Sequence, residues 1–195
     1  DEERVVYEED ESPEEKERRH LEARDKRRAE RKALEEKEKR DVKERKKKKK
    51  EEMNFARKNQ IRLAQAYQIA RKSGLKHNLI IAGKHLPQIK KKIGHLPGIF
   101  FLDWVTNEQL LQLYQGADAF VLPSIHEGFG IPLVESMCCG VPCISTNKHS
   151  PQHLIQDAGI LINPYDVSEL SNSMLNLAKD PKLLKELSEK SLKRS

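Results

Sequence analysis

Apolar and polar residues are arranged in two different ways along the chain, and the change falls near Met53. After Met53, short apolar runs bounded by glycine or polar residues indicate buried strands, whereas apolar residues three and four apart indicate amphipathic helices. The predicted strands are residues 78–82, 99–102, 119–122, 142–145 and 160–162. The predicted helices are residues 59–72, 86–93 and 107–114, a helix that opens near Ile131, and residues 167–178 and 182–192.

Strands that alternate with helices predict a parallel sheet with right-handed crossovers. We therefore expect an α/β fold: a Rossmann-like parallel sheet with flanking helices. In such sheets ligands bind at the carboxyl ends of the strands. The turn from Ser124 to Gly130 follows a predicted strand directly, so it is the first place to look for a site.

The first 52 residues follow no such pattern. They contain 20 acidic and 20 basic residues, against 11 acidic and 17 basic in residues 53–195, so the net charge of +6 belongs to the second part. Residues 1–15 are mostly acidic, and the basic residues end in the run Lys46–Lys50. Apolar residues are too few here for a sustained heptad seam, so we predict a long charged helix or a disordered arm. The expected domains are thus residues 1–52 and residues 53–195.

The basic part of the arm suits an acidic partner or an anionic membrane surface. It has no interleaved aromatic residues for base stacking, so we do not expect specific nucleic acid recognition. No run approaches the ~20 apolar residues of a membrane span, and the start is unlike a signal peptide. We expect a cytoplasmic location, or one at the membrane periphery. Cys138, Cys139 and Cys143 lack the spacing of metal ligands, so we expect reduced, buried side chains and no metal.

The clearest chemistry lies in Val121-Leu-Pro-Ser-Ile-His-Glu-Gly-Phe-Gly-Ile-Pro-Leu-Val-Glu135. Gly128 and Gly130 allow a sharp turn in which a ligand can approach the main chain closely. The helix that follows offers free N–H groups and the positive end of its dipole to an anion. Glu127 and Glu135 frame this turn, and carboxylates bind sugar hydroxyls well. The stretch therefore predicts a ligand with both a diphosphate and sugar hydroxyls.

This stretch, together with the Cys-Gly-Val-Pro that follows it, resembles the paired-glutamate motif of retaining glycosyltransferases of family 4, which have the GT-B fold. The resemblance runs from about Phe55 to the C-terminus and covers the C-terminal, nucleotide-sugar-binding half of such enzymes. It implies hexosyl transfer with retention from a UDP-, GDP- or ADP-sugar, with no cofactor and no metal. The acceptor is not indicated.

The resemblance also implies roles for individual residues. Lys58 and the N–H groups of the Phe129 turn would neutralise the leaving diphosphate. Glu127 would hold hydroxyls of the transferred sugar, Glu135 would hold those of the ribose, and the main chain near Val105 would meet the base. The implied catalytic residues are thus Lys58 and Glu127. The implied donor-binding residues are Lys58, Gly83, Val105, Glu127, Gly128, Phe129, Gly130 and Glu135. His126 either touches the sugar or only faces solvent.

The chain departs from the family's pattern in ways that affect these roles. The family's domain begins with a strand that ends in Gly-Arg, whereas residues 49–53 read Lys-Lys-Glu-Glu-Met here. That strand is central in a doubly wound sheet, so we expect a cleft in the core. A family glycine is Asp103, and a family Pro-Glu pair is Gln152-His153.

Three hypotheses remain open at this point. The chain is the donor domain of a glycosyltransferase that, without an acceptor domain, transfers sugar weakly or not at all. Alternatively it is a non-catalytic module that binds a nucleotide or a protein and carries a basic helical arm. The third hypothesis is a truncated or misjoined fragment.

Overall fold

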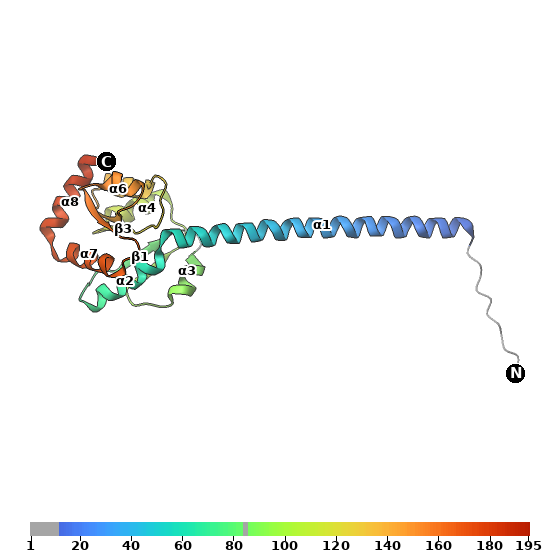
Figure 1. Ribbon diagram of the computed structural model, residues 1–195, viewed down its shortest axis with the longest axis horizontal. Helices are drawn as coiled ribbons and strands as arrows, with labels where there is room; N and C mark the ends of the chain where they lie inside the picture. Colours follow the sequence, from blue (N-terminus) through green and yellow to red (C-terminus); the bar gives the residue numbers. More distant parts are fainter. Residues whose placement is uncertain (1–11, 84–85) are drawn as a thin grey trace, which may run out of the picture. The chain divides into compact units, whose positions relative to one another are not determined.

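The structure is a computed structural model that describes residues 12–83 and 86–195 (Figure 1). The chain divides between Lys50 and Glu51 into two compact units. The acidic residues that precede Ser12 lie outside the described part.

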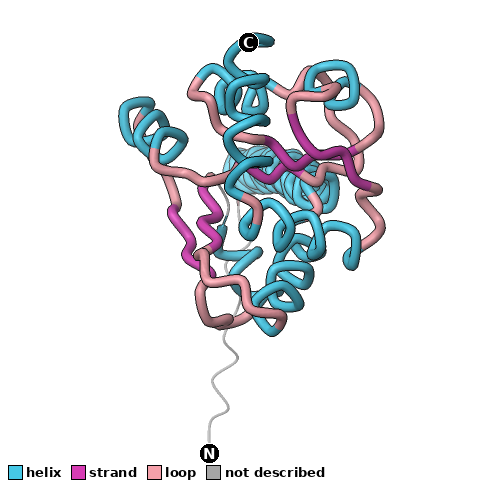
Figure 2. The backbone as a smooth tube through the Cα atoms, turned by 90° about the vertical axis from the view of Figure 1, so that its left-hand side faces the viewer, coloured by secondary structure: helices cyan, strands magenta, loops and turns pink. Residues whose placement is uncertain are grey.

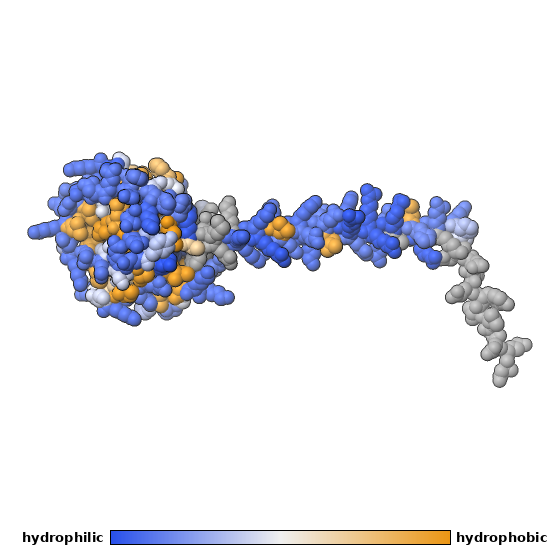
Figure 3. Space-filling view, in the orientation of Figure 1, coloured by the Kyte–Doolittle hydropathy of each residue, from blue (hydrophilic) through white to orange (hydrophobic). Residues whose placement is uncertain are grey.

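Helix α1 (Pro13–Lys58) is 46 residues long, so residues 13–52 of the predicted arm form a charged helix. A capping box fixes its start: Glu15 N–H donates to Ser12 Oγ (3.3 Å), and Ser12 N–H donates to the Glu15 carboxylate (3.0 Å). Pro13 then takes a position where a missing N–H costs nothing. Among the side chains of α1 that the structure describes, the large apolar ones are exposed and widely spaced (Figure 3), namely Leu21, Leu34 and Val42.

The described residues of the second unit form five parallel strands in two separate sheets. Strand β1 (Leu79–Ala82) pairs with β2 (Ile99–Leu102), with Leu79 opposite Ile99. Strand β4 (Cys143–Thr146) lies between β3 (Phe120–Leu122) and β5 (Gly159–Ile162). The α/β architecture with parallel strands and flanking helices is as the sequence predicted; β2 has the predicted bounds, and the bounds of the other strands differ by at most one residue.

Seven helices of the second unit flank these strands. They are α2 (Gln60–Lys72), α3 (Leu86–Ile93), α4 (Asn107–Gln115), α5 (Ile131–Cys138), α6 (Ser150–Ile155), α7 (Val167–Lys179) and α8 (Pro181–Arg194). Their starts follow local chemistry: Thr106 forms a capping box on α4, and Asp166 and Asp180 accept N–H bonds at the starts of α7 and α8. Helix α2 packs against α7, and their apolar faces meet Ile81, Ile144 and other core residues.

The sheet is interrupted where the sequence predicted a missing central strand. In the described residues β1 has β2 as its one neighbour, and β3 has β4 as its one neighbour. Figure 2 shows the β1–β2 pair standing apart from the three other strands. Because β1 and β3 line the same cavity, the gap between the two sheets is the expected cleft.

Helix α6 and the exposure of two cysteines differ from the sequence-based expectation. Helix α6 was not predicted, because its six residues are too few to show a period. Cys138 is exposed and Cys139 is half-buried, so only Cys143 fits the expectation of a buried thiol. Burial raises the pKa of the Cys143 thiol to about 11. Within the described part of the chain, no helix is both long and apolar enough to cross a membrane.

Candidate functional site

The predicted turn and helix form as the sequence indicated. Strand β3 ends at Leu122, the turn follows, and α5 begins after Gly130, which has a left-handed φ of +89°. A Cβ added at Gly130 would come within 3.2 Å of Leu133 and 3.3 Å of Leu154, so both the conformation and the space favour glycine. At the start of α5, Pro132 has no N–H, and the N–H groups of Leu133 and Val134 donate to the Gly130 carbonyl (2.8 and 3.4 Å), so the N–H of Ile131 is the first-turn donor that has no partner within the helix.

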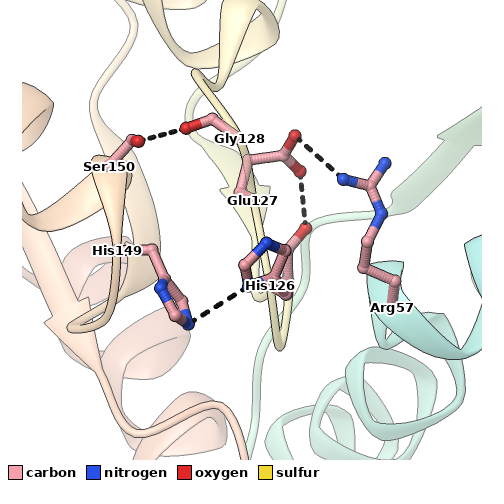
Figure 4. Close-up of polar contacts among 7 residues, drawn as sticks. Arg57, His126, Glu127, Gly128, His149 and Ser150 are labelled. Atoms are coloured by element: carbon pink, nitrogen blue, oxygen red, sulfur yellow. Dashed lines mark hydrogen bonds and ion pairs between the residues drawn. The ribbon is translucent and has the colours of Figure 1, made fainter.

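Glu127 is nearly buried, with its side chain 11% exposed, and both of its carboxylate oxygens have protein partners (Figure 4). Oε2 accepts a hydrogen bond from Ser124 Oγ (3.1 Å), and Oε1 lies 3.6 Å from Nη1 of Arg57. In the described residues the buried Nε of Arg57 has no hydrogen-bond partner. Glu127 and Arg57 thus form a charged pair in which the Nε–H of the arginine remains available as a donor.

Asn59 ties this turn to the start of the domain. Its side chain is buried, and Nδ2 donates to the carbonyls of Pro123 (3.0 Å) and Pro164 (2.6 Å). Asn59 also has a left-handed φ of 59°, which ends α1 and lets α2 start at the next residue. The sequence predicted a helix over residues 59–72, whereas α2 begins at Gln60. Arg57 and Lys58 are the last residues of α1, and Asn59 is the hinge between the two helices.

A cavity of about 830 Å³ brings together four of the predicted site residues from four separate segments. Its lining includes Lys58, Gly83, Val105 and Glu135. Lys58 is half-buried there, and Gly83 follows β1 with a φ of +144°. The cavity runs along β1 and β3, from residues that precede these strands to Gly83 and Pro123 that follow them, so it reaches the carboxyl ends, where ligands of doubly wound sheets bind.

Glu135 stands on α5 and is held by an aromatic neighbour. The hydroxyl of Tyr114 donates to Oε2 of Glu135 at 3.0 Å. Burial, together with this hydrogen bond to a carboxylate, raises the pKa of Tyr114 far above its ordinary value. Glu135 itself is exposed, so its second oxygen is open to a ligand hydroxyl.

The remaining predicted residues lie on the turn and do not line the cavity. Gly128 and Phe129 are exposed, with 63% of the Phe129 side chain accessible. Gly128 is fixed from the other side, because its carbonyl accepts a hydrogen bond from Ser150 at the start of α6. The predicted site residues therefore fall into two groups, one that lines the cavity and one on the turn. Lys58 lines the cavity and is adjacent in sequence to Arg57 and Asn59, which contact the turn.

Sequence reasoning gave no role to a histidine pair beside the turn. His126 Nδ1 lies 3.4 Å from His149 Nε2, with ring centroids 4.4 Å apart (Figure 4). His149 holds a φ of 58°, which is uncommon for histidine. No sequence signal links these residues, since the fold alone brings them together. Arg57 was missed for the same reason.

Comparison with known proteins places this geometry in a family. The family model described as glycosyl transferases group 1 matches residues 35–194, which is most of the chain. The chain belongs to the group 1 glycosyltransferases. The match begins at residue 35, within α1, and so starts earlier than the resemblance near Phe55 indicated.

The curated relatives of this chain include a mannosyltransferase and a sucrose synthase. The O-antigen chain mannosyltransferase B of Escherichia coli is 36% identical over 125 residues, which are 60% of this chain and 33% of that protein. Sucrose synthase 1 of Zea mays is 35% identical over 82 residues, which are 39% of this chain and 10% of that protein. The chain thus spans a third or less of the length of these curated relatives.

Solved structures confirm the fold. The C-terminal domain of the glycosyl transferase group 1 protein LpcC from Francisella tularensis aligns with a TM-score of 0.61 at 21% identity, over 71% of this chain and 77% of that one. WaaG, a glycosyltransferase involved in lipopolysaccharide biosynthesis, aligns equally well, with a TM-score of 0.61 at 22% identity, over 71% of this chain and 39% of that one. The second unit therefore has the GT-B type of Rossmann-like fold.

Proposed function

We propose that residues Glu51–Ser195 form the nucleotide-sugar-binding domain of a retaining glycosyltransferase of family 4. The observation that carries this proposal is the cavity that reaches the carboxyl ends of the strands, since its lining includes a lysine, a main-chain segment and a carboxylate from three places in the sequence. A nucleoside diphosphate offers a complementary set of groups: a diphosphate, a base and ribose hydroxyls.

The diphosphate would lie between Lys58 and the start of α5. Lys58 supplies a cation, and the N–H groups of Phe129 and Gly130 supply uncharged donors at the positive end of the helix dipole. Arg57, with its unpaired Nε, adds a second cation beside them. In the transfer step these groups would stabilise the negative charge that develops on the leaving diphosphate.

Glu135 and Glu127 would bind different hydroxyl groups of the nucleotide sugar. Glu135 keeps one oxygen open beside the cavity and would bind the ribose hydroxyls. Glu127 would bind hydroxyls of the transferred sugar. Because Ser124 and Arg57 now hold both of its oxygens, binding the sugar means sharing the carboxylate with these partners or displacing them. Arg57 would then be released toward the diphosphate.

The names of the relatives indicate which sugar to test first. The mannosyltransferases of Escherichia coli stand among the curated relatives, so mannose is the first candidate for the transferred sugar. In retaining enzymes of family 4 the acceptor attacks from the face that the nucleotide leaves. Since the cavity is lined by one domain, we propose that efficient transfer by this chain needs a separate acceptor-binding domain.

The experiment is a calorimetric titration of the full chain with UDP, GDP and ADP, followed by the nucleotide sugar of whichever nucleotide binds. We expect one nucleotide to bind with a micromolar to millimolar Kd. Glu127→Gln is expected to leave the affinity for the nucleoside diphosphate unchanged within about twofold and to lower that for the nucleotide sugar about tenfold, since one charged hydrogen-bond acceptor for the sugar is lost. A folded protein that binds none of the three would instead favour a non-catalytic interaction module.

A further inference from the structure

Two cations lie over one aromatic ring outside the cavity. The guanidinium carbon of Arg62 lies 5.4 Å from the ring centroid of Tyr165, and Nζ of Lys148 lies 5.2 Å from the same centroid. These three residues, the Tyr165 cluster, are not among those that line the cavity. They come from the first turn of α2, the loop after β4 and the loop after β5. The fold therefore assembles a second positively charged group, separate from the one proposed for the diphosphate.

The Tyr165 cluster lies at the same edge of the sheet as Glu127. Strands β3, β4 and β5 are parallel neighbours in that order, so the loops that follow them leave the sheet at one edge. Glu127 follows β3, Lys148 follows β4 and Tyr165 follows β5. The first two loops also touch, since His126 Nδ1 lies 3.4 Å from His149 Nε2 (Figure 4). The cluster is thus a neighbour of the turn that carries Glu127.

Hydrogen bonds position the ring and the guanidinium before any ligand binds. Asn59 donates from Nδ2 to the Pro164 carbonyl (2.6 Å), and its Oδ1 accepts a bond from Nη1 of Arg62 (3.0 Å). The N–H of Tyr165 donates to Oδ1 of Asn163 (3.1 Å), which fixes the loop after β5 in a turn. Tyr165 nevertheless remains 50% exposed. A ligand therefore meets an accessible ring whose backbone is already ordered, which lowers the entropy cost of binding.

In the described residues, no carboxylate forms an ion pair with either cation of the cluster. The acids at the start of α7 are used locally. Asp166 Oδ1 accepts from the N–H of Glu169 (2.9 Å), and Glu169 Oε2 accepts from the N–H of Asn163 (2.8 Å). Two like charges near one ring repel each other, and an anion bound to both would remove that repulsion. A guanidinium has five N–H donors and an ammonium three, so donors remain for such a ligand.

We propose that the Tyr165 cluster binds a phosphate monoester group of the acceptor. This assignment rests on the proposed function, in which the transferred sugar lies at Glu127 and the acceptor must approach it there. Arg62 offers a planar fork to the phosphate oxygens, Lys148 offers a point charge, and the Tyr165 hydroxyl is a further donor. The exposed ring supplies an apolar surface for the carbon atoms next to the phosphate. The rest of the acceptor would bind the separate domain.

Two cations match the charge of a phosphate monoester better than the single charge of a carboxylate. The acceptor is therefore a phosphorylated sugar or polyol, either free in solution or as the headgroup of a lipid. Both sources present the same group to the cluster, so the experiment uses one probe for each.

The first probe is glycerol 3-phosphate, titrated into the full chain at low ionic strength and followed by amide NMR shifts. We expect saturable shifts at Lys148 and Tyr165 with a Kd in the millimolar range, and none with glycerol. Lys148→Gln should weaken binding about threefold to fivefold, as for an exposed charge pair. Arg62→Lys keeps the charge, so it should retain affinity that Arg62→Gln loses. Lys72→Gln removes an exposed cation at the other end of α2 and should bind as wild type does.

The second probe is a vesicle of phosphatidylcholine with about one-fifth phosphatidic acid, with binding measured by sedimentation. The lysines of α1 give the same background in every variant, so the comparison of Lys148→Gln with wild type and Lys72→Gln is decisive. Vesicle binding that depends on Lys148, without binding of glycerol 3-phosphate, identifies a lipid headgroup. Lys148-dependent binding of glycerol 3-phosphate identifies a soluble acceptor. The proposal is overturned if Lys148→Gln binds both probes as well as wild type does.

The nucleotide titration described above is a separate measurement on the same chain. A protein that binds a nucleotide, but neither phosphate probe through Lys148, keeps the proposed function and refutes the phosphate site. A protein that binds phosphate at the Tyr165 cluster but no nucleotide keeps the anion site and refutes its assignment to a transferase acceptor.

Discussion

Replacing Asn59 with aspartate is expected to lower the free energy of unfolding of the globular unit by about 3 kcal/mol, which is large for a change of one atom. Asn59 is buried, and its Nδ2 donates to the carbonyls of Pro123 and Pro164. Aspartate puts an oxygen where those two carbonyls need a donor, so two hydrogen bonds become repulsive contacts in a buried site. The backbone conformation is not the cause, since aspartate tolerates a left-handed φ nearly as well as asparagine.

Denaturant unfolding followed by the fluorescence of Trp104, the single tryptophan of the chain, reports on this unit without the signal of α1. Asn172→Asp, at an exposed position of α7, makes the same chemical change and should shift the stability by less than about 0.5 kcal/mol. Equal losses in the two variants would show that the Asn59 bonds do not hold the turn to the helix junction.

Replacing Lys58 with alanine is expected to lower the affinity for a nucleoside diphosphate ~10–100-fold, or about 1.4–2.7 kcal/mol, if the lysine meets the diphosphate. The affinity for the corresponding nucleoside, which has no phosphate, should change less than twofold. The physical reason is the loss of a half-buried cation from the cavity, where screening by water is weaker than at the surface.

Lys76 provides the matched control. It lines the same cavity, but it precedes β1 and so lies at the opposite ends of the strands. Lys76→Ala should leave both affinities unchanged. If Lys76→Ala weakens diphosphate binding as much as Lys58→Ala does, the effect comes from the overall charge of the cavity and not from a defined phosphate site.

Much of the fold could be predicted because its signals are local. The helix Leu86–Ile93 and the strand Ile99–Leu102 have the predicted bounds, since each is a distinct apolar pattern closed by glycine or polar residues. The turn before α5 was predicted from two glycines and a proline whose conformational needs are specific. The interruption of the sheet was also predicted, because a charged stretch cannot form a buried central strand.

What could not be predicted depends on contacts between distant residues. The hydrogen bonds of Asn59 to Pro123 and Pro164 join it to residues 64 and 105 positions away in the sequence, and no local sequence pattern indicates these contacts. The Arg57–Glu127 pair and the His126–His149 pair have the same origin. The end of α1 at Lys58 was misplaced because Arg57-Lys58 is equally compatible with the end of one helix and the start of the next.

The proposed donor site depends on Glu135 binding the ribose of a nucleotide. Its most direct test is a cycle that compares the bound nucleoside diphosphate with its 2′,3′-dideoxy form, in wild type and in Glu135→Ala. Wild type is expected to prefer the ribose form about tenfold, in line with one charged hydrogen bond of ~1.5 kcal/mol, and Glu135→Ala should lose that preference. A Glu135→Ala variant that still prefers the ribose form as strongly as wild type would contradict the proposed site.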